Sequence, residues 1–262
     1  MGLFKQIVAE IQTLIEAKNY KKNKNTVRAT MLAMDKAYPV PTLENYAPHP
    51  QYAEHLKKCQ SNFVDYAIHD MKKDNDKTIG IGDSLLAQAV NEVSEVIDPR
   101  LNWALGGARA CHIVTLLKDM IPIMKQYGFT PKNIVVGTPD GNGLLVHNEI
   151  NNVIEQCNIL LNFIRQEFFS TRIIIYGIPM AIIDYIIQNY SAYQTNLFNW
   201  MMKDVNAVLL PLIKYFVEGY HIMMKSDYSC DGVHLSPKGR YLFGQLIQKG
   251  KCGSPNRLIN KK

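Results

Sequence analysis

The stretch Thr78-Ile79-Gly80-Ile81-Gly82-Asp83-Ser84-Leu85 decides the fold. Its first four residues are mostly apolar and precede a glycine, so they predict a short buried strand. A helical pattern follows from Leu85 to Val96. Ser84 is therefore expected at the carboxyl end of a strand, just where a helix begins. A strand followed at once by a helix is the unit from which parallel α/β sheets are built.

The same alternation of apolar runs and helical periodicity continues along the chain. We therefore predict a flavodoxin-like three-layer α/β/α fold, in which helices cover both faces of a five-stranded parallel sheet. The other expected strands are Leu101–Leu105, Asn133–Val136, Arg172–Tyr176 and Tyr220–Met224, and the other expected helices are Cys111–Tyr127, Ile150–Phe168 and the long region Ile182–Phe216.

A second motif, Asp231-Gly232-Val233-His234, supplies the groups that a reactive serine needs. A serine hydroxyl is a poor nucleophile until an imidazole takes its proton, and the imidazole needs an acceptor that fixes its tautomer. His234 is the candidate base, and Asp231 can reach its ring if the segment forms a tight turn. Alternatively, Ser84 only caps a helix, and Asp231 and His234 are turn residues on a surface loop. Sites in parallel sheets form at the carboxyl ends of strands, so we interpret the three residues as a catalytic triad.

These two blocks resemble those of the GDSL esterase/lipase family, also called SGNH hydrolases. Its nucleophilic serine lies in a Gly-Asp-Ser block and its aspartate and histidine in an Asp-x-x-His block, which match Ser84, Asp231 and His234. The resemblance covers about residues 78–248. It implies an ester hydrolase that forms an acyl-enzyme on Ser84 and needs no cofactor or metal. The family's substrates include O-acetyl carbohydrates, short acyl esters and lipid esters, and the sequence does not choose among them.

Two other functions remain open from the sequence. An O-acyltransferase would use the same acyl-enzyme but pass the acyl group to a sugar hydroxyl. A catalytically decayed SGNH binding module would keep the fold without the chemistry.

The resemblance also implies an oxyanion hole, the set of donors that stabilises the charged oxygen formed during acyl transfer. The family uses the backbone amide of the nucleophile, a glycine amide after the second strand and an asparagine side chain after the third. Here Ser84 supplies the first donor. Gly107, in Leu105-Gly106-Gly107-Ala108, matches the second, with Gly106 as the alternative, and Asn142 matches the third.

The third block departs from the family pattern Gly-x-Asn-Asp. It reads Asp140-Gly141-Asn142-Gly143, so Asp140 replaces the glycine and Gly143 the aspartate. An alignment on Gly137-Thr138-Pro139-Asp140 would leave no asparagine, and Asn142 would then be a turn residue. Nearby, Arg109 is expected at an exposed helix start, with contact to an anionic or carbohydrate substrate as the alternative.

Three regions are expected along the chain. Residues 1–77 form an N-terminal helical extension, residues 78–250 the hydrolase domain and residues 251–262 a basic C-terminal tail. An apolar stripe from Leu3 to Ile15 must be buried against something. We expect the extension to pack on the hydrolase domain. A contact in an oligomer and a lid over the substrate are the alternatives.

Composition excludes several classes of protein. The chain has 262 residues, a formal charge of +6 and five cysteines without a Cys-x-x-Cys pair, which favours neither a disulfide framework nor a zinc site. The scattered lysines indicate a solvated surface or attraction to an anionic partner such as cell-wall polymer, nucleic acid or lipid headgroups, without a specific nucleic-acid signal. No run approaches the ~18 apolar residues of a membrane span, and the N-terminus lacks a secretory pattern. We therefore expect a cytoplasmic protein, or one released without a signal peptide.

Overall fold

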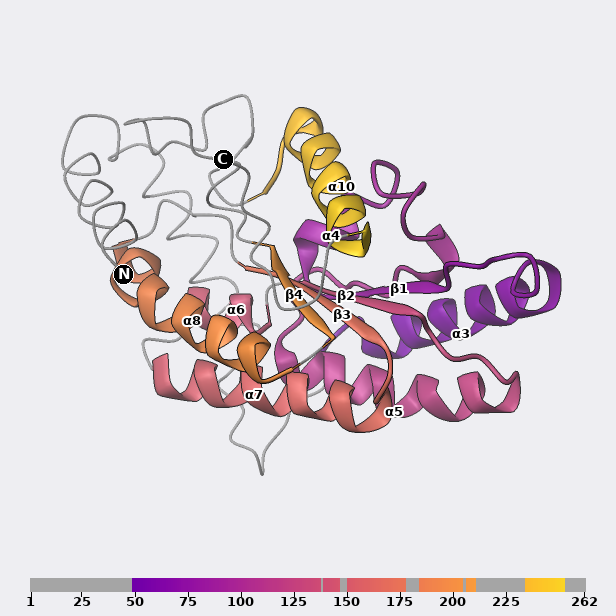
Figure 1. Cartoon of the computed structure of the whole chain (residues 1–262), viewed down its shortest axis with the longest axis horizontal. Helices are drawn as coiled ribbons and strands as arrows, with labels where there is room; N and C mark the ends of the chain where they lie inside the picture. Colours follow the sequence, from indigo (N-terminus) through magenta and orange to yellow (C-terminus); the bar gives the residue numbers. More distant parts are fainter. Residues whose placement is uncertain are drawn as a thin grey trace.

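The computed structural model describes residues 49–137, 139–146, 150–177, 184–204, 206–210 and 234–252. Figure 1 labels the elements within these ranges. The helices are α3 (Tyr52–His69), α4 (Ser84–Gln88), the 3-10 helix η1 (Pro99–Leu101), α5 (Ala110–Gln126), α6 (Gly141–Val146), α7 (Ile150–Glu167), α8 (Asp184–Lys203) and α10 (Pro237–Cys252), and the strands are β1 (Thr78–Ile81), β2 (Asn133–Gly137), β3 (Arg172–Tyr176) and β4 (Ala207–Leu210).

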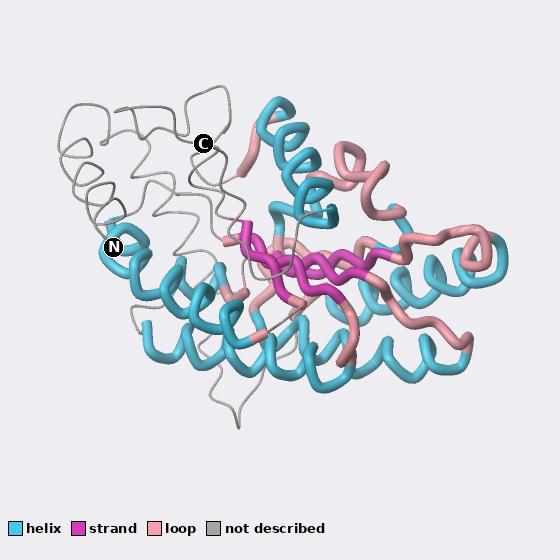
Figure 2. Tube along the Cα trace, in the orientation of Figure 1, coloured by secondary structure: helices cyan, strands magenta, loops and turns pink. Residues whose placement is uncertain are grey.

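The described strands form one parallel sheet in the order β1-β2-β3-β4. Almost every strand residue is buried, because helices lie on both faces and the strand sequences are nearly continuous apolar runs. Helices α4 and α10 lie on one face, and α5, α7 and α8 on the other (Figures 1 and 2). The predicted three-layer α/β fold is confirmed.

The segment predicted as the second strand, Leu101–Leu105, is not a regular strand. Its first residue still belongs to η1, because Pro99 starts a 3-10 turn that Asp98 caps by accepting from the Arg100 N–H. The segment nevertheless follows the free edge of β1. The N–H of Trp103 donates to the Gly80 carbonyl at 2.7 Å, and that of Leu105 to the Gly82 carbonyl at 3.0 Å. With this segment included, the order is 2-1-3-4-5, the doubly wound order of flavodoxin-like sheets.

Two predicted helices were wrong in extent. The region Ile182–Phe216 contains α8 and then β4, separated by a turn in which Asp204 Oδ1 accepts from the Asn206 N–H at 2.9 Å. A short apolar run such as β4 cannot be told from buried helix by periodicity alone. The strand predicted at Tyr220–Met224 lies outside the described residues.

The helix predicted over Leu85–Val96 is also shorter than expected. Helix α4 ends at Gln88 and is followed by turns. In a longer helix the Leu86 carbonyl would accept from the N–H four residues further on. Here it accepts from the Ala89 N–H at 3.3 Å and from Asn102 Nδ2 at 3.2 Å. A side chain from the neighbouring segment thus helps to end the helix.

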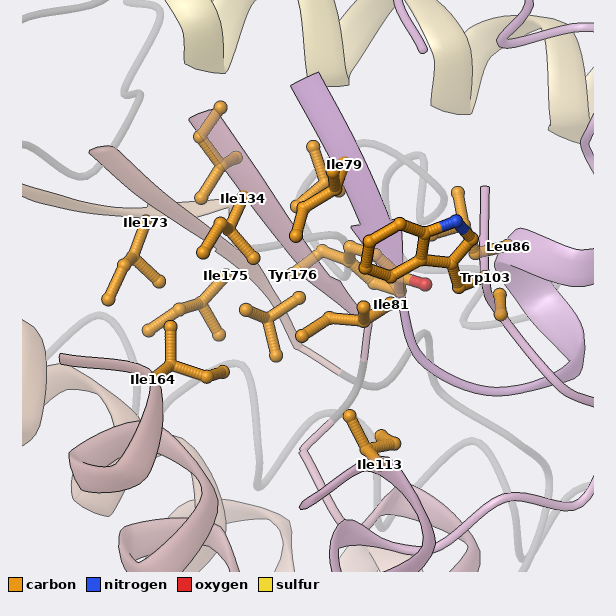
Figure 3. Close-up of a cluster of buried hydrophobic side chains, with 14 of the residues drawn as sticks. Ile79, Ile81, Leu86, Trp103, Ile113, Ile134, Ile164, Ile173, Ile175 and Tyr176 are labelled. Carbon is orange, nitrogen blue, oxygen red and sulfur yellow. The ribbon is translucent and has the colours of Figure 1, made fainter. Parts of the chain in front are cut away.

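The core lies on both faces of the sheet, and helix α3 shares it. Figure 3 shows the isoleucines of β1, β2 and β3 in one cluster, with Trp103 next to those of β1 and with Ile113 of α5 and Ile164 of α7 on the helix side. Phe63 of α3 is fully buried, and its ring meets those of Trp103 and Phe129 edge to face. The described end of the segment 1–77 therefore packs into the core of the sheet domain. The stripe from Leu3 to Ile15 lies outside the described residues.

Candidate functional site

Ser84 lies at the carboxyl end of the sheet, as the first residue of α4. Asp83 caps this helix, because its Oδ1 accepts from the Leu85 N–H at 3.0 Å. Ser84 is therefore not the helix cap, which removes one of the alternatives raised by its sequence. Ser84 is only partly buried, whereas its neighbours Asp83 and Leu85 are buried.

His234 reaches Ser84 from far along the chain. Its Nε2 lies 3.1 Å from Ser84 Oγ, although the two residues are 150 positions apart. The next residue, Leu235, is buried, and Ser236 caps α10 by accepting from the Gly239 N–H at 3.2 Å. These local contacts hold the short stretch of chain between His234 and the start of α10. Asp231, the predicted orienting carboxylate, lies outside the described residues.

The Gly106–Gly107 turn comes close to the serine. A Cβ placed on Gly106 would lie 3.9 Å from Ser84 Cβ. The turn is closed by a hydrogen bond of 3.0 Å from the Ala108 N–H to the Leu105 carbonyl, and Gly107 has φ +75°, a left-handed conformation that favours glycine. Within the described parts of the chain, neither the Gly106 nor the Gly107 N–H donates a hydrogen bond. Gly106 thus lies beside the nucleophile, and Gly107, the other predicted candidate for the second donor, follows it in the same turn.

Asn142 is buried at the start of α6, next to the same turn. Its Nδ2 donates to the Ala108 carbonyl at 2.8 Å. Because an amide nitrogen carries two hydrogens, this bond orients the group and leaves a second hydrogen for another acceptor. The structure thus brings the second and third predicted blocks together.

Arg109 is not exposed, contrary to expectation. It is 3% exposed and pairs with the equally buried Asp140. Asp140 Oδ1 accepts from Arg109 Nε at 3.1 Å and from the Ala110 N–H at 3.1 Å, while Oδ2 accepts from Arg109 Nη2 at 3.1 Å. Burial opposes the charge of the guanidinium, but the Asp140 carboxylate raises the pKa of Arg109 above its ordinary value.

This ion pair explains both departures in the third block. Asp140 has φ +52°, a conformation that aspartate tolerates better than most residues and that suits the glycine of the family pattern. A Cβ on Gly143 would lie only 2.0 Å from Asp140 Oδ2 and 2.9 Å from Arg109 Nη2. The aspartate at 140 therefore requires a glycine at 143. Sequence reasoning missed the pair, although the two coupled departures beside an unexplained arginine were the available signal.

No other chemistry is indicated in the described residues. Among them, no three His, Cys, Asp or Glu side chains lie close enough to hold a metal ion. No helix in this part of the chain is long and apolar enough to cross a membrane. Cys157 donates to the Pro139 carbonyl at 2.6 Å, and burial raises the pKa of its thiol well above the ordinary value, so it is not an activated nucleophile.

In sequence, no protein-family model matches the chain and no curated protein matches it. Solved structures do match. A protein from Streptococcus pneumoniae, provisionally described as a platelet activating factor, superposes with a TM-score of 0.58 and 16% identity over 76% of this chain and 94% of its own. One from Bacteroides fragilis, provisionally described as an acylhydrolase, has a TM-score of 0.55 and 16% identity over 73% of this chain and 96% of its own. The chain shares the fold of these two proteins.

A third solved structure is less similar. A provisionally described GDSL-like lipase from Parabacteroides merdae has a TM-score of 0.48 and 14% identity, over 68% of this chain and 96% of its own. The fold that the two sequence motifs predicted is confirmed by the first two structures.

Proposed function

We propose that the chain is a serine esterase that hydrolyses carboxylic esters through an acyl-enzyme on Ser84. The observation that carries this proposal is the 3.1 Å contact between His234 Nε2 and Ser84 Oγ, made at the carboxyl end of a parallel sheet. A hydroxyl beside an imidazole is the activated nucleophile of acyl transfer. Asp231 is proposed as the carboxylate that orients the imidazole.

In this mechanism Ser84 Oγ attacks the ester carbonyl carbon while His234 Nε2 takes the hydroxyl proton. The carbonyl oxygen gains negative charge, which the N–H groups of Ser84 and Gly107 and the amide of Asn142 stabilise. His234 then returns its proton to the leaving alcohol as the carbon–oxygen bond breaks. In the second half, His234 takes a proton from water, water attacks the acyl-enzyme, and Ser84 leaves with the proton restored.

Support for the oxyanion hole comes from the placement of its three parts. The Gly106–Gly107 turn lies beside Ser84, and Asn142 Nδ2 donates a hydrogen bond to the carbonyl of Ala108, the last residue of the same turn. The site chemistry does not choose an ester. Acetylated carbohydrates, short acyl esters and lipid esters are the substrate classes to test.

The test is a panel of p-nitrophenyl esters of increasing chain length together with acetylated sugars. Wild type should hydrolyse at least one class, and a fluorophosphonate probe should label Ser84. Ser84→Ala should lose both the ester hydrolysis and the labelling. His234→Ala should fold and lose about a thousandfold or more in turnover. Labelling that persists in Ser84→Ala, or a wild type that is neither labelled nor active on any ester, overturns the proposal.

Product analysis with acceptor sugars present separates hydrolysis from transfer. Free acid as the product supports the esterase. An acylated sugar would mean that the same acyl-enzyme serves an O-acyltransferase.

A further inference from the structure

His49 lies in the segment that precedes α3, outside the region of the family resemblance, yet it touches the predicted oxyanion turn. Its Nε2 lies 2.9 Å from the Gly106 carbonyl oxygen. Its Nδ1 accepts from the Gln51 N–H at 3.2 Å. Because a backbone N–H can only donate, Nδ1 is the unprotonated nitrogen of the ring. The ring proton therefore sits on Nε2, which donates to the Gly106 carbonyl.

This bond fixes the direction of the next N–H group. The Gly106 carbonyl and the Gly107 N–H belong to one planar peptide, and no cis peptide occurs in the described chain. In a trans peptide the carbonyl and the N–H point in opposite directions. Holding the carbonyl toward His49 therefore directs the Gly107 N–H away from it. That N–H is the donor that the proposed mechanism requires beside Ser84.

A peptide between two glycines needs such an anchor. Neither residue has a Cβ, so the φ and ψ angles that rotate this peptide are restricted less than elsewhere in the chain. A donor that swings away from the oxyanion loses its effect, because this kind of stabilisation depends on preorganised geometry. A hydrogen bond to the carbonyl also polarises the whole amide and strengthens the N–H as a donor.

The imidazole is itself well held. His49 is 3% exposed, and its ring stands edge-on to that of His112, with centroids 5.3 Å apart. His112 is anchored in turn, because its Nδ1 accepts from the Arg109 N–H at 3.0 Å. Burial lowers the pKa of His49 below its ordinary value, although the hydrogen bond with the Gly106 carbonyl opposes this shift in part. The neutral ring, with one donor and one acceptor, is the form that both hydrogen bonds need.

We propose that His49 is a positioning residue of the oxyanion hole: through the Gly106 carbonyl it aims the Gly107 N–H at the oxygen that becomes charged. The inference rests on the proposed esterase function. It makes the segment ahead of α3 part of the catalytic machinery, acting through the backbone of Gly106 and Gly107.

The test compares two amide replacements that differ by one methylene. In His49→Gln the amide nitrogen can take the place of Nε2 and donate to the Gly106 carbonyl. In His49→Asn the side chain is one methylene shorter, so its amide nitrogen does not reach that carbonyl. Loss of one oxyanion donor typically costs a factor of about 100 in kcat. We expect His49→Asn to lower kcat on the best ester by about 10- to 100-fold with KM nearly unchanged, and His49→Gln to stay within about threefold of wild type.

His55→Asn is the matched control. Its imidazole Nε2 lies 3.0 Å from the Trp103 carbonyl, in the same segment but three residues before Gly106. Its loss should lower thermal stability and leave kcat near that of wild type. All variants are assayed at a temperature at which circular dichroism shows them folded, and a boronic acid inhibitor reports affinity for a tetrahedral adduct.

Weaker boronate binding and a lower kcat in His49→Asn, both restored in His49→Gln, support the proposal. It is overturned if folded His49→Asn has the wild-type kcat, if folded His49→Gln is as impaired as His49→Asn, or if His55→Asn lowers kcat equally. Each of these results requires an active wild type. An inactive, unlabelled wild type overturns the esterase function instead.

Discussion

Replacing Asp140 with asparagine should destabilise the protein by about 3–5 kcal/mol, the usual cost of removing one partner from a buried ion pair. Asparagine keeps the shape of the side chain and tolerates the φ of +52° at this position, so the change removes little besides the charge. Arg109 would then be a guanidinium with only 3% exposure and no counter-charge. One of its nitrogens, Nη1, already has no hydrogen-bond partner among the residues that the structure describes.

A double-mutant cycle of Asp140 and Arg109 tests whether the buried ion pair stabilises the fold. Arg109→Met should be destabilising as well, because it leaves the Asp140 carboxylate buried without its cation. The double variant should be more stable than the sum of the two single losses predicts, by about 1–3 kcal/mol, since neither charge is left alone. Urea unfolding followed by circular dichroism measures all four proteins. If the two losses in the free energy of unfolding are additive, or if Asp140→Asn loses less than about 1 kcal/mol, the ion pair does not stabilise the fold as we reason.

Three further predictions follow from the site and the core. Asn142→Ala should lower kcat by about a hundredfold with little change in KM, and a steady-state assay showing a change in KM alone would instead place this side chain in ground-state binding. Phe63→Ala should cost about 3–5 kcal/mol in urea unfolding because the ring is fully buried, and a loss below 1 kcal/mol would mean that α3 is only loosely attached. Burial lowers the pKa of both His49 and His55 below 6.5, so below that pH the unfolded chain binds more protons than the folded one. The free energy of unfolding should therefore fall as the pH drops from about 6.5, and the double replacement by glutamine should flatten this decline in urea titrations at several pH values.

How far the sequence predicts this fold differs from element to element. Strands β1, β2 and β3 appear as apolar runs flanked by polar or turn residues, and their predicted bounds match the structure within a residue. β4 was hidden inside a long apolar region, because four consecutive apolar residues fit a buried strand and a buried helix equally well. The end of α4 depends on Asn102, whose side chain reaches the Leu86 carbonyl from another segment.

The candidate site divides in the same way. The motif around Ser84 is local, since the strand, the glycine and the Asp83 cap are neighbours in sequence, and the predicted position at the strand end is what the structure contains. The burial of Arg109 is not local. Its partner lies 31 residues away, and nothing in the sequence near a helix start distinguishes an exposed arginine from one that meets a buried carboxylate.

By itself, the sequence determined which chemical groups are present and which of them stand at the end of a strand. A strand, its turn and the helix start are set by contacts among neighbouring residues, and these can be deduced from a short stretch of chain. Only the tertiary structure decided that His234 meets Ser84 and that His49 holds Gly106. Such contacts join segments that the sheet and its helices bring together, and the hydrogen bonds form only after packing has brought donor and acceptor within reach.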